Sequence, residues 1–224
     1  MRRHLVIGAS GHAQEVAWSL RESLHARGED CELLFFDDGL PAGPVPGGLG
    51  DIVGGLEVGP DHARDASLVL GVGLPRVKRA VVERLGHLDL PWTVVVHPAA
   101  VVAPNVRLGE GSYLAAGAIA TVNSRIGRFV TVNFHCVVAH DDVVGDFATL
   151  HPNAHLSGYV TIGERVEIGT GAVVLPRVSI GDDAVLGAGC VAVRSLGGGT
   201  TYVGLPARAL VAPAARTHER FAKT

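Results

Sequence analysis

The second half of the chain repeats an aliphatic residue at every sixth position, and this repeat constrains the fold more than any other feature. The span 96–197 holds seventeen such hexads without an insertion, and each marked position is Val, Leu or Ile except for two alanines. The series is Val96, Val102, Leu108, Leu114, Ala120, Ile126, Val132, Val138, Val144, Leu150, Leu156, Ile162, Ile168, Val174, Ile180, Leu186 and Ala192. A strict period of six with frequent glycine excludes an α-helix, whose apolar stripe recurs about every 3.6 residues.

The hexads predict a prism of three flat sheets, in which each hexad supplies one short strand and one corner. Three hexads complete a coil, so each side chain is expected above the one eighteen residues earlier, and stacked coils stabilise one another. The aliphatic residue points inward, and a small residue usually follows four positions later. Cys136 and Cys190 occupy this small position, which predicts packing thiols rather than nucleophiles. The spacing does not fix the handedness, and a purely structural solenoid stays open here.

The first 92 residues alternate strands and helices, which predicts a small Rossmann-like βαβαβ domain with a parallel sheet. The expected elements are a strand at 4–7, a helix that carries Val16, Leu20 and Leu24, a strand at 33–36, a strand at 67–72 and a helix at 76–85. The Gly- and Pro-rich residues 39–60 are expected to form a loop. The predicted divisions are therefore residues 1–92, a repeat domain at 93–212 and a C-terminal tail at 213–224.

Composition and charge narrow the expected partners and compartment. A net charge of −3 argues against nucleic acid or an anionic membrane as a partner. Cys31, Cys136 and Cys190 lack the spacing of disulfides or metal ligands, which favours free thiols in a reducing cytoplasm. The apolar run at residues 5–7 is too short for a signal peptide or a bilayer span.

The turn after the first strand could bind a phosphate group. Its sequence, GASGHA, places backbone N–H groups at a helix N-terminus, where anions bind well. It lacks the second glycine of a dinucleotide fingerprint, so a purely structural tight turn is the alternative. Asp37 and Asp38 end the second strand, where such folds bind a ribose or base, and a solvated turn is the alternative for this pair.

Histidines gather in one part of the repeat. His140 stands next to Asp141, a pairing that can hold a general base in one tautomer if the two residues sit at a corner of the prism. An ordinary surface histidine is the alternative for His140. The spacing of His135 and His140 also permits a zinc site of the γ-carbonic anhydrase type, although the carboxylate after His140 counts against it. The aromatic residues Phe129, Phe134, Phe147 and Tyr159 show no regular spacing.

Taken together, the two halves resemble the bacterial sialic acid O-acetyltransferase and UDP-bacillosamine N-acetyltransferase family. The resemblance covers about residues 3–208. It rests on GASGHA, FFDD, GVGLPRVKRAVVERL, the HP that leads into the coil, VNFHCVVAHDDVVGDF, IGTGAVVLPRVSIGDDAVLGAGCVAV and VGLPAR. Hexads alone are common to many acyltransferases, but their combination with the GASGHA domain is far more specific. The resemblance implies a left-handed parallel β-helix, a homotrimer with active sites between subunits, and a role in cell-surface polysaccharide biosynthesis.

The resemblance also implies roles for particular residues. His140 falls on the general base of the family and Asp141 on its neighbouring acid. The implied substrate-binding residues are Ser10, Gly11, His12, Asp37, Asp38, Gly73, Arg76 and Asn133. The implied contacts to acetyl-CoA, with no metal expected, are Thr149, Gly158, Thr170 and Ala188.

The expected activity is transfer of an acetyl group from acetyl-CoA to the amine of a nucleotide-linked amino-deoxy sugar. O-acetylation of a sugar such as sialic acid is the alternative, and a metal-binding or non-catalytic solenoid is a more distant one. Two positions depart from the family. At the first, one branch of the family has a histidine that contacts CoA, whereas this chain has Thr149 and carries a histidine two residues later, His151. At the second, this chain has His135 where many relatives have a small residue.

Overall fold

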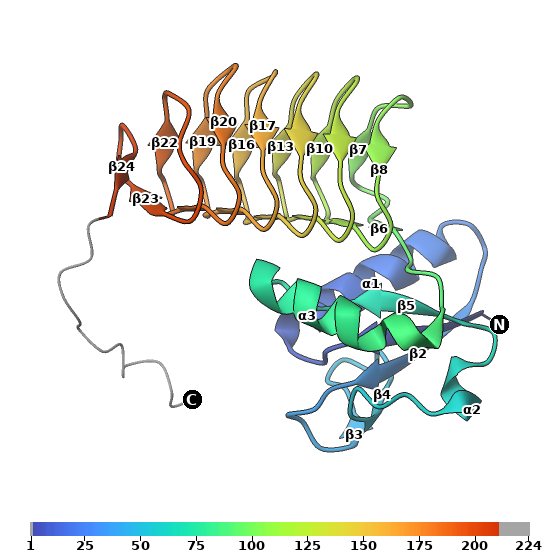
Figure 1. Cartoon of the computed structure of the whole chain (residues 1–224). Helices are drawn as coiled ribbons and strands as arrows, with labels where there is room; N and C mark the ends of the chain where they lie inside the picture. Colours follow the sequence, from blue (N-terminus) through green and yellow to red (C-terminus); the bar gives the residue numbers. More distant parts are fainter. Residues whose placement is uncertain (1, 211–224) are drawn as a thin grey trace.

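The N-terminal domain is built around a five-stranded sheet (Figure 1). The computed structural model describes residues 2–210, so the predicted tail at 213–224 lies outside the described residues. The elements are β1 (Arg2–Ile7), α1 (Gly11–His25), β2 (Cys31–Phe36), β3 (Gly43–Pro44), β4 (Asp51–Gly54), α2 (Pro60–Ala63), β5 (Ala66–Leu70), α3 (Pro75–Leu85) and the 3₁₀-helix η1 (Gly86–Leu88). The strand order is β3-β4-β2-β1-β5, and every pair is parallel except β3 with β4.

The prediction of a loop at residues 39–60 is wrong for part of that segment. Strand β4 pairs in parallel with β2, with Leu34 opposite Asp51, and β3 adds an antiparallel edge. Gly50, at φ +155° just before β4, passes so close to β2 that a Cβ there would lie 2.2 Å from the Leu33 carbonyl oxygen. The absence of a side chain at Gly50 thus allows the two strands to pair closely, although the Gly and Pro content of the segment predicts a loop.

The repeat domain forms the predicted prism of short strands. Strands β6 to β22 each hold two residues, and the second is always the aliphatic or alanine residue of the six-residue series. They are β6 (Val95–Val96), β7 (Val101–Val102), β8 (Arg107–Leu108), β9 (Tyr113–Leu114), β10 (Ile119–Ala120), β11 (Arg125–Ile126), β12 (Thr131–Val132), β13 (Val137–Val138), β14 (Val143–Val144), β15 (Thr149–Leu150), β16 (His155–Leu156), β17 (Thr161–Ile162), β18 (Glu167–Ile168), β19 (Val173–Val174), β20 (Ser179–Ile180), β21 (Val185–Leu186) and β22 (Val191–Ala192).

Three parallel sheets form the sides of the prism. We call them sheet B (β6-β9-β12-β15-β18-β21), sheet C (β7-β10-β13-β16-β19-β22) and sheet D (β8-β11-β14-β17-β20). Partners lie eighteen residues apart, as in Val132 opposite Leu150. At the far end β23 (Thr201–Val203) and β24 (Arg208–Ala209) extend sheet B. The predicted period of one coil is therefore confirmed.

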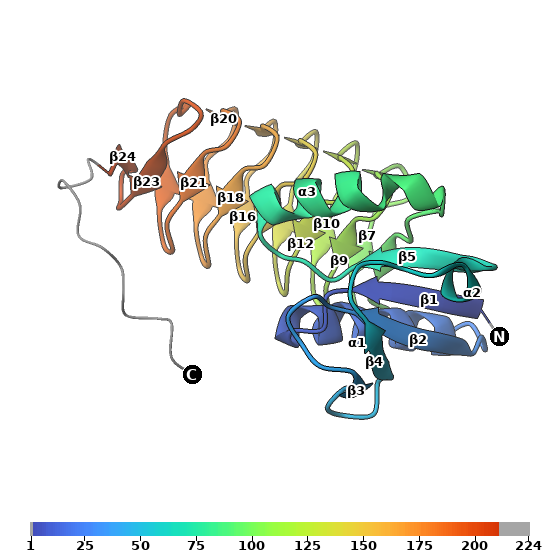
Figure 2. The same ribbon diagram turned by 60° about the horizontal axis from the view of Figure 1, so that its bottom comes forward.

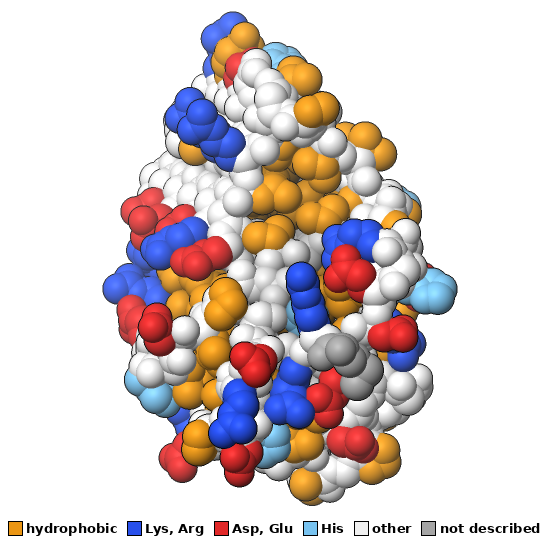
Figure 3. Space-filling view, turned by 90° about the vertical axis from the view of Figure 1, so that its right-hand side faces the viewer, with side chains coloured by type: hydrophobic (Ala, Val, Ile, Leu, Met, Phe, Trp, Pro, Cys, Tyr) orange, Lys and Arg blue, Asp and Glu red, His pale blue; other side chains and the backbone are white. Residues whose placement is uncertain are grey.

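The core of the prism is filled by the series residues and by the small residues that follow them. Leu114, Leu150 and Leu186 are fully buried, and so are Cys136 and Cys190, as predicted. Burial raises the pKa of the Cys136 thiol to about 12, so the thiol stays protonated. The first coil is only half-buried because no coil stacks before it, and Figure 3 shows hydrophobic side chains gathered at this end.

The corners of the prism hold a left-handed backbone. The third residue after each inward residue repeatedly has a positive φ, as in Asp141 at +60° and Phe129 at +57°. Phe129 and Phe147 are eighteen residues apart, at the same corner of successive coils, and their rings stack with centroids 5.2 Å apart. The expectation that the aromatic residues lack regular spacing is therefore wrong for this pair.

The N-terminal domain packs beneath sheet B (Figures 1 and 2). The Ser19 hydroxyl of α1 lies 3.0 Å from the Tyr113 hydroxyl of β9, and both groups are buried. The predicted boundary at residues 92 and 93 falls between η1 and β6, where Trp92 bridges to Leu68 of β5. Within residues 2–210, no helix is long and apolar enough to cross a membrane.

Candidate active site

A cavity of about 510 Å³ lies between the N-terminal domain and sheet B of the prism. It opens beside the carboxyl ends of β1, β2 and β5, which is where ligands bind in open α/β sheets. Its walls come from the β1–α1 turn, the end of β2, the β5–α3 turn and the ends of β12 and β15. The cavity therefore joins residues from both domains.

The wall from the N-terminal domain is the predicted phosphate turn. Gly8 has φ +98°, a backbone conformation that favours glycine, and it lets the chain turn sharply into α1. Ser10 is the N-cap of α1 but makes no capping bond through its side chain. The Asp37 carboxylate accepts the Ala9 N–H at 2.8 Å and the Gly39 N–H at 2.8 Å, so it holds this turn and its own loop together.

The wall from the prism carries Asn133, Thr149 and His151. Asn133 and His151 follow β12 and β15 at equivalent places in successive coils. The Thr149 hydroxyl donates a hydrogen bond of 2.7 Å to the Gly73 carbonyl, which ties the β5–α3 turn to sheet B. His151 Nε2 lies 2.7 Å from a carboxylate oxygen of Glu167 on β18.

Two basic side chains sit deep between the domains. Burial, with smaller contributions from Lys78 and His151, lowers the pKa of His12 to about 4, so its imidazole is neutral at physiological pH. His12 Nε2 is buried without a hydrogen-bond partner. Lys78 of α3 is fully buried and donates to Phe129 O, Thr131 Oγ1 and Ala148 O at 2.8 to 3.1 Å. Burial also lowers the Lys78 pKa.

The His140 and Asp141 pair lies at a different part of the prism, the corner between sheets C and D. His140 Nδ1 lies 2.9 Å from Asp141 Oδ2, so the corner lets these adjacent side chains meet. The hydrogen bond from His140 is the main reason that the Asp141 pKa is lowered. The imidazole side chain is half exposed, and its free Nε2 can accept a proton.

The space around His140 Nε2 is shaped by Gly158 of the next coil. Gly158 has φ +93°, and a Cβ there would lie 2.8 Å from His140 Nε2. The Tyr159 ring packs edge-on against the imidazole, with centroids 5.1 Å apart. A glycine is therefore needed beside the nitrogen that would accept a proton.

Several predicted site residues meet in the cavity and others do not. Its walls include Ser10, His12, Asp37, Gly73 and Asn133, together with the predicted CoA contact Thr149. Gly11, Asp38 and Arg76 are not among its lining residues. Asp38 instead accepts the Leu56 N–H and pairs with Arg84.

The remaining predicted CoA contacts lie on two corners. Thr170 and Ala188 are exposed at the corner between sheets B and C, whereas Gly158 lies beside His140 at the corner between sheets C and D. His135 also lies at the corner between sheets B and C, so the two histidines of the zinc alternative occupy different corners. Within residues 2–210, no group of three or more His, Cys, Asp or Glu side chains is arranged to hold a metal.

Sequence reasoning missed the buried side chains that join the domains. Lys78 lies in a run of charged residues that is typical of an exposed helix face, and Glu167 has no motif around it. The coil period could have identified Glu167 as a neighbour of the site, because it stands eighteen residues after Thr149 on the same face.

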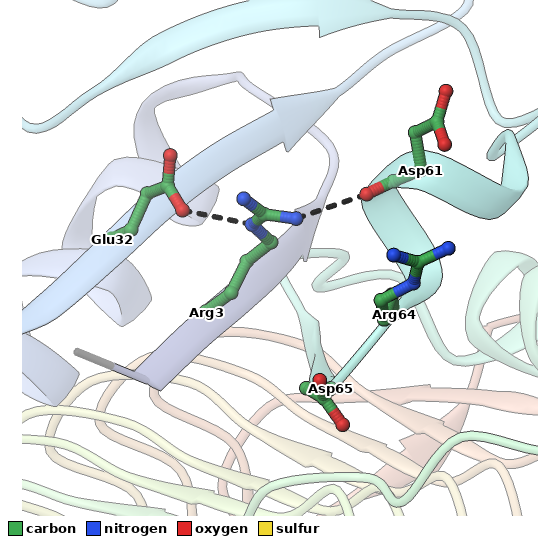
Figure 4. A pocket seen from close by; sticks show the side chains of 5 residues that line it. All are labelled: Arg3, Glu32, Asp61, Arg64 and Asp65. Carbon is green, nitrogen blue, oxygen red and sulfur yellow. Dashed lines mark hydrogen bonds and ion pairs between the residues drawn. The ribbon is translucent and has the colours of Figure 1, made fainter.

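A second hollow, of about 380 Å³, lies at the opposite, amino-terminal edge of the N-terminal sheet (Figure 4). Arg3 donates to Glu32 at 2.8 Å and to the Asp61 carbonyl at 3.0 Å. Its lining residues also include Arg64 and Asp65, so two arginines and three acidic residues surround the hollow. The hollow contains none of the predicted site residues and lacks the helix N-terminus of the first cavity.

Comparison with known proteins relates both domains to solved structures. A family model described as bacterial transferase hexapeptide (six repeats) matches residues 143–175 and 159–192. The acetyltransferase domain of PglB from Neisseria gonorrhoeae is 34% identical over 94% of this chain and 100% of that one, with a TM-score of 0.83. That domain has also been solved with acetyl coenzyme A. No curated protein sequence matches the chain.

Two further structures are similar over nearly the whole chain. A perosamine N-acetyltransferase from Caulobacter crescentus, solved as a mutant with CoA and GDP-perosamine, is 32% identical over 94% of this chain and 97% of that one, with a TM-score of 0.81. WeeI from Acinetobacter baumannii is 31% identical over 94% of this chain and 100% of that one, with a TM-score of 0.80.

Proposed function

This chain belongs to the hexapeptide-repeat sugar acetyltransferases, a family of acetyl-CoA-dependent enzymes with a left-handed β-helix, and we propose that it acetylates the amine of a nucleotide-linked amino-deoxy sugar. The observation that carries this proposal is the joining of a phosphate-type turn to a wall of the β-helix in one cavity. The similarity to a perosamine N-acetyltransferase that binds GDP-perosamine supports an amine as the acceptor.

In the proposed reaction the sugar amine attacks the thioester carbonyl of acetyl-CoA. A C–N bond forms, the C–S bond breaks, and CoA leaves as the thiol. His140 Nε2 accepts the proton that the amine loses and passes it to the departing CoA sulfur, while Asp141 holds Nδ1 and stabilises the ring in its protonated state. A backbone N–H stabilises the oxyanion of the tetrahedral intermediate. Cys136 and Cys190 are buried in the prism, so direct transfer is favoured over an acyl-enzyme.

A homotrimer would bring the separated parts of this site together. The outer face of sheet C is apolar apart from one histidine, and its residues are Val101, Ile119, Val137, His155, Val173 and Val191. Val101 is 62% exposed in the single chain. This face separates the corner that carries His140 from the corner that carries Asn133, Thr170 and Ala188. If sheet C packs around a threefold axis, the first corner of one subunit meets the second corner of its neighbour.

The test is release of the CoA thiol with a panel of UDP-, GDP- and dTDP-linked 4-amino-4,6-dideoxy sugars. We expect turnover with at least one of them. His140→Ala should lower kcat by about 10²- to 10⁴-fold, because the general base is lost. Acetyl-CoA should still raise the melting temperature of the variant nearly as much as that of the wild type.

His25→Ala is the matched control, because His25 is exposed at the C-terminal end of α1, whereas the cavity lies at the N-terminal end of that helix. Its turnover should equal that of the wild type. Near-normal turnover by the His140→Ala variant would contradict the assignment of His140 as the general base. Turnover of a hydroxyl analogue, with none of any amine, would favour the O-acetyltransferase alternative.

A further inference from the structure

A second histidine–carboxylate pair has its histidine, His151, in the wall of the cavity, and the proposed transfer step leaves this pair without a role. His151 Nε2 lies 2.7 Å from Glu167 Oε1, and the two side chains are 31% and 28% exposed. The hydrogen bond from His151 is the main reason that the Glu167 pKa is lowered, with smaller contributions from Arg76 and Lys78. Glu167 is thus ionised and fixes the orientation of the ring.

The surroundings leave His151 available to a ligand. Thr149, its neighbour on the same wall, already donates its hydroxyl to Gly73. Lys78 directs its ammonium at three oxygens between the domains. Because Nε2 of His151 is occupied by Glu167, Nδ1 is the ring nitrogen that remains for a ligand in the cavity.

The position of His151 also fits contact with the acceptor. It stands eighteen residues after Asn133, at the equivalent place in the next coil, and both line the cavity. His12 lines the same cavity from the other domain, with Nε2 buried and unpartnered. Three polar side chains from two domains therefore converge on one space.

We propose that His151, oriented by Glu167, hydrogen-bonds through Nδ1 to a ring hydroxyl of the acceptor sugar and sets which sugars the enzyme accepts. This inference rests on the proposed function. When Nε2–H is donated to the carboxylate and Nδ1 carries no proton, Nδ1 is a hydrogen-bond acceptor, which suits a hydroxyl donor. A sugar that lacks this hydroxyl should leave the nitrogen unpaired and bind poorly.

Two variants of His151 separate contact with the sugar from support of Glu167. His151→Asn keeps a polar atom near the position of Nδ1 but cannot reach Glu167. His151→Gln keeps a polar atom near the position of Nε2, so it retains the contact with Glu167 and loses the group at Nδ1. Steady-state kinetics of these variants and of His151→Ala would be measured with the best nucleotide-linked amino sugar, varying each substrate in turn.

We expect His151→Ala and His151→Gln to lower kcat/KM for the nucleotide sugar by about 10- to 100-fold, mainly through KM, as for loss of one polar contact. The KM for acetyl-CoA should stay within about twofold, and His151→Asn should recover part of the loss. His87→Ala, at an exposed histidine of η1, is the control and should match the wild type.

Other outcomes overturn the proposal in different ways. Recovery by Gln but not by Asn would show that His151 serves only to hold Glu167. A rise in the KM for acetyl-CoA alone would place His151 on CoA. A wild-type chain that turns over no nucleotide-linked amino sugar overturns both this inference and the proposed function, whereas an active wild type with unaffected variants overturns only the inference.

Discussion

At the scale of single residues, three consecutive side chains at one corner have three different environments. His140 is half exposed, and Asp141 lies beside it on the surface. Asp142 points into the prism and is fully buried. Its carboxylate accepts the Ala139 N–H and the Val160 N–H, both at 2.8 Å, so it holds the corner that carries His140 to the next coil.

The burial of Asp142 makes the stability of this corner depend on pH. Desolvation raises the Asp142 pKa to about 6, above its unfolded value near 4. The stabilising contribution of the protonated form is therefore complete below about pH 4 and is lost as the pH rises through about 6. Since one pKa unit corresponds to about 1.4 kcal/mol, the loss is on the order of 2 to 3 kcal/mol.

Asp142→Asn removes this titration and isolates its effect. We expect the difference in unfolding free energy, wild type minus variant, to be largest near pH 4 and to fall by about 2 to 3 kcal/mol by pH 7. Urea unfolding of both proteins at several pH values measures it. A difference that is constant, or that grows with pH, contradicts the raised pKa.

At the scale of elements, α3 is fixed to the prism by one long side chain. Lys78 reaches from the helix between β12 and β15, where its three hydrogen-bond acceptors lie. Ala148 O also accepts the Thr131 N–H, so it keeps a partner if the lysine is removed. The carbonyl of Phe129 depends on Lys78 more strongly, because no backbone donor to it is found within residues 2–210.

Removal of the Lys78 side chain should weaken the packing of α3 against the prism. Lys78→Ala leaves a cavity and unpaired oxygens, and we expect it to lower the free energy of unfolding by about 2 to 4 kcal/mol. Arg79→Ala is the control, because Arg79 forms an exposed ion pair with Glu83 on the same helix, and such pairs contribute at most about 0.5 kcal/mol. Urea denaturation compares the two variants, and equal stabilities would contradict the docking role of Lys78.

The same elements show what the sequence can predict and what it cannot. The strands of the prism were predictable because the side-chain pattern of each hexad is local and repeats without interruption. Strand β4 was not, because its parallel pairing with β2 needs a crossover through Gly- and Pro-rich residues that carry no strand pattern. The corner of His140 could be predicted from its position in the hexad, whereas the burial of Lys78 depends on how two domains dock.

At the scale of the whole molecule, the single chain separates groups that the proposed reaction needs together. His140 lies at one edge of the apolar sheet C face, and the cavity with Asn133 and His151 lies toward the other edge. A packed homotrimer would pair these edges between neighbouring subunits. Each active site would then take its base from one chain and its sugar cavity from another.

Mixed trimers test this arrangement directly. Ser10→Tyr should block the cavity with little effect on folding, because Ser10 is exposed and makes no capping bond. We expect this variant and His140→Ala to be inactive when each is expressed alone. Co-expression of the two should restore about a quarter of wild-type activity. In randomly mixed trimers, about one interface in four joins an intact His140 from one chain to an intact cavity from its neighbour. Thiol release by the purified mixture measures it, and trimers mixed after purification of stable homotrimers serve as the control.

The contrary result is equally specific. A site contained within one subunit would gain nothing from mixing, because each chain would keep its own defect. Mixed trimers without activity, at a composition verified by mass spectrometry, would therefore place the whole site in one chain.

The eighteen-residue register of the prism also limits how proteins of this kind can change in length. An insertion of one hexad would move every later residue to the next side of the prism. In the later coils the outward valines of sheet C would then lie on the side of sheet D, whose own outward residues are mostly polar: Arg107, Arg125, Val143, Thr161 and Ser179. An insertion of one full coil would leave every side unchanged. Gene duplication or loss can therefore lengthen or shorten the scaffold in whole coils while the geometry between the two corners is preserved.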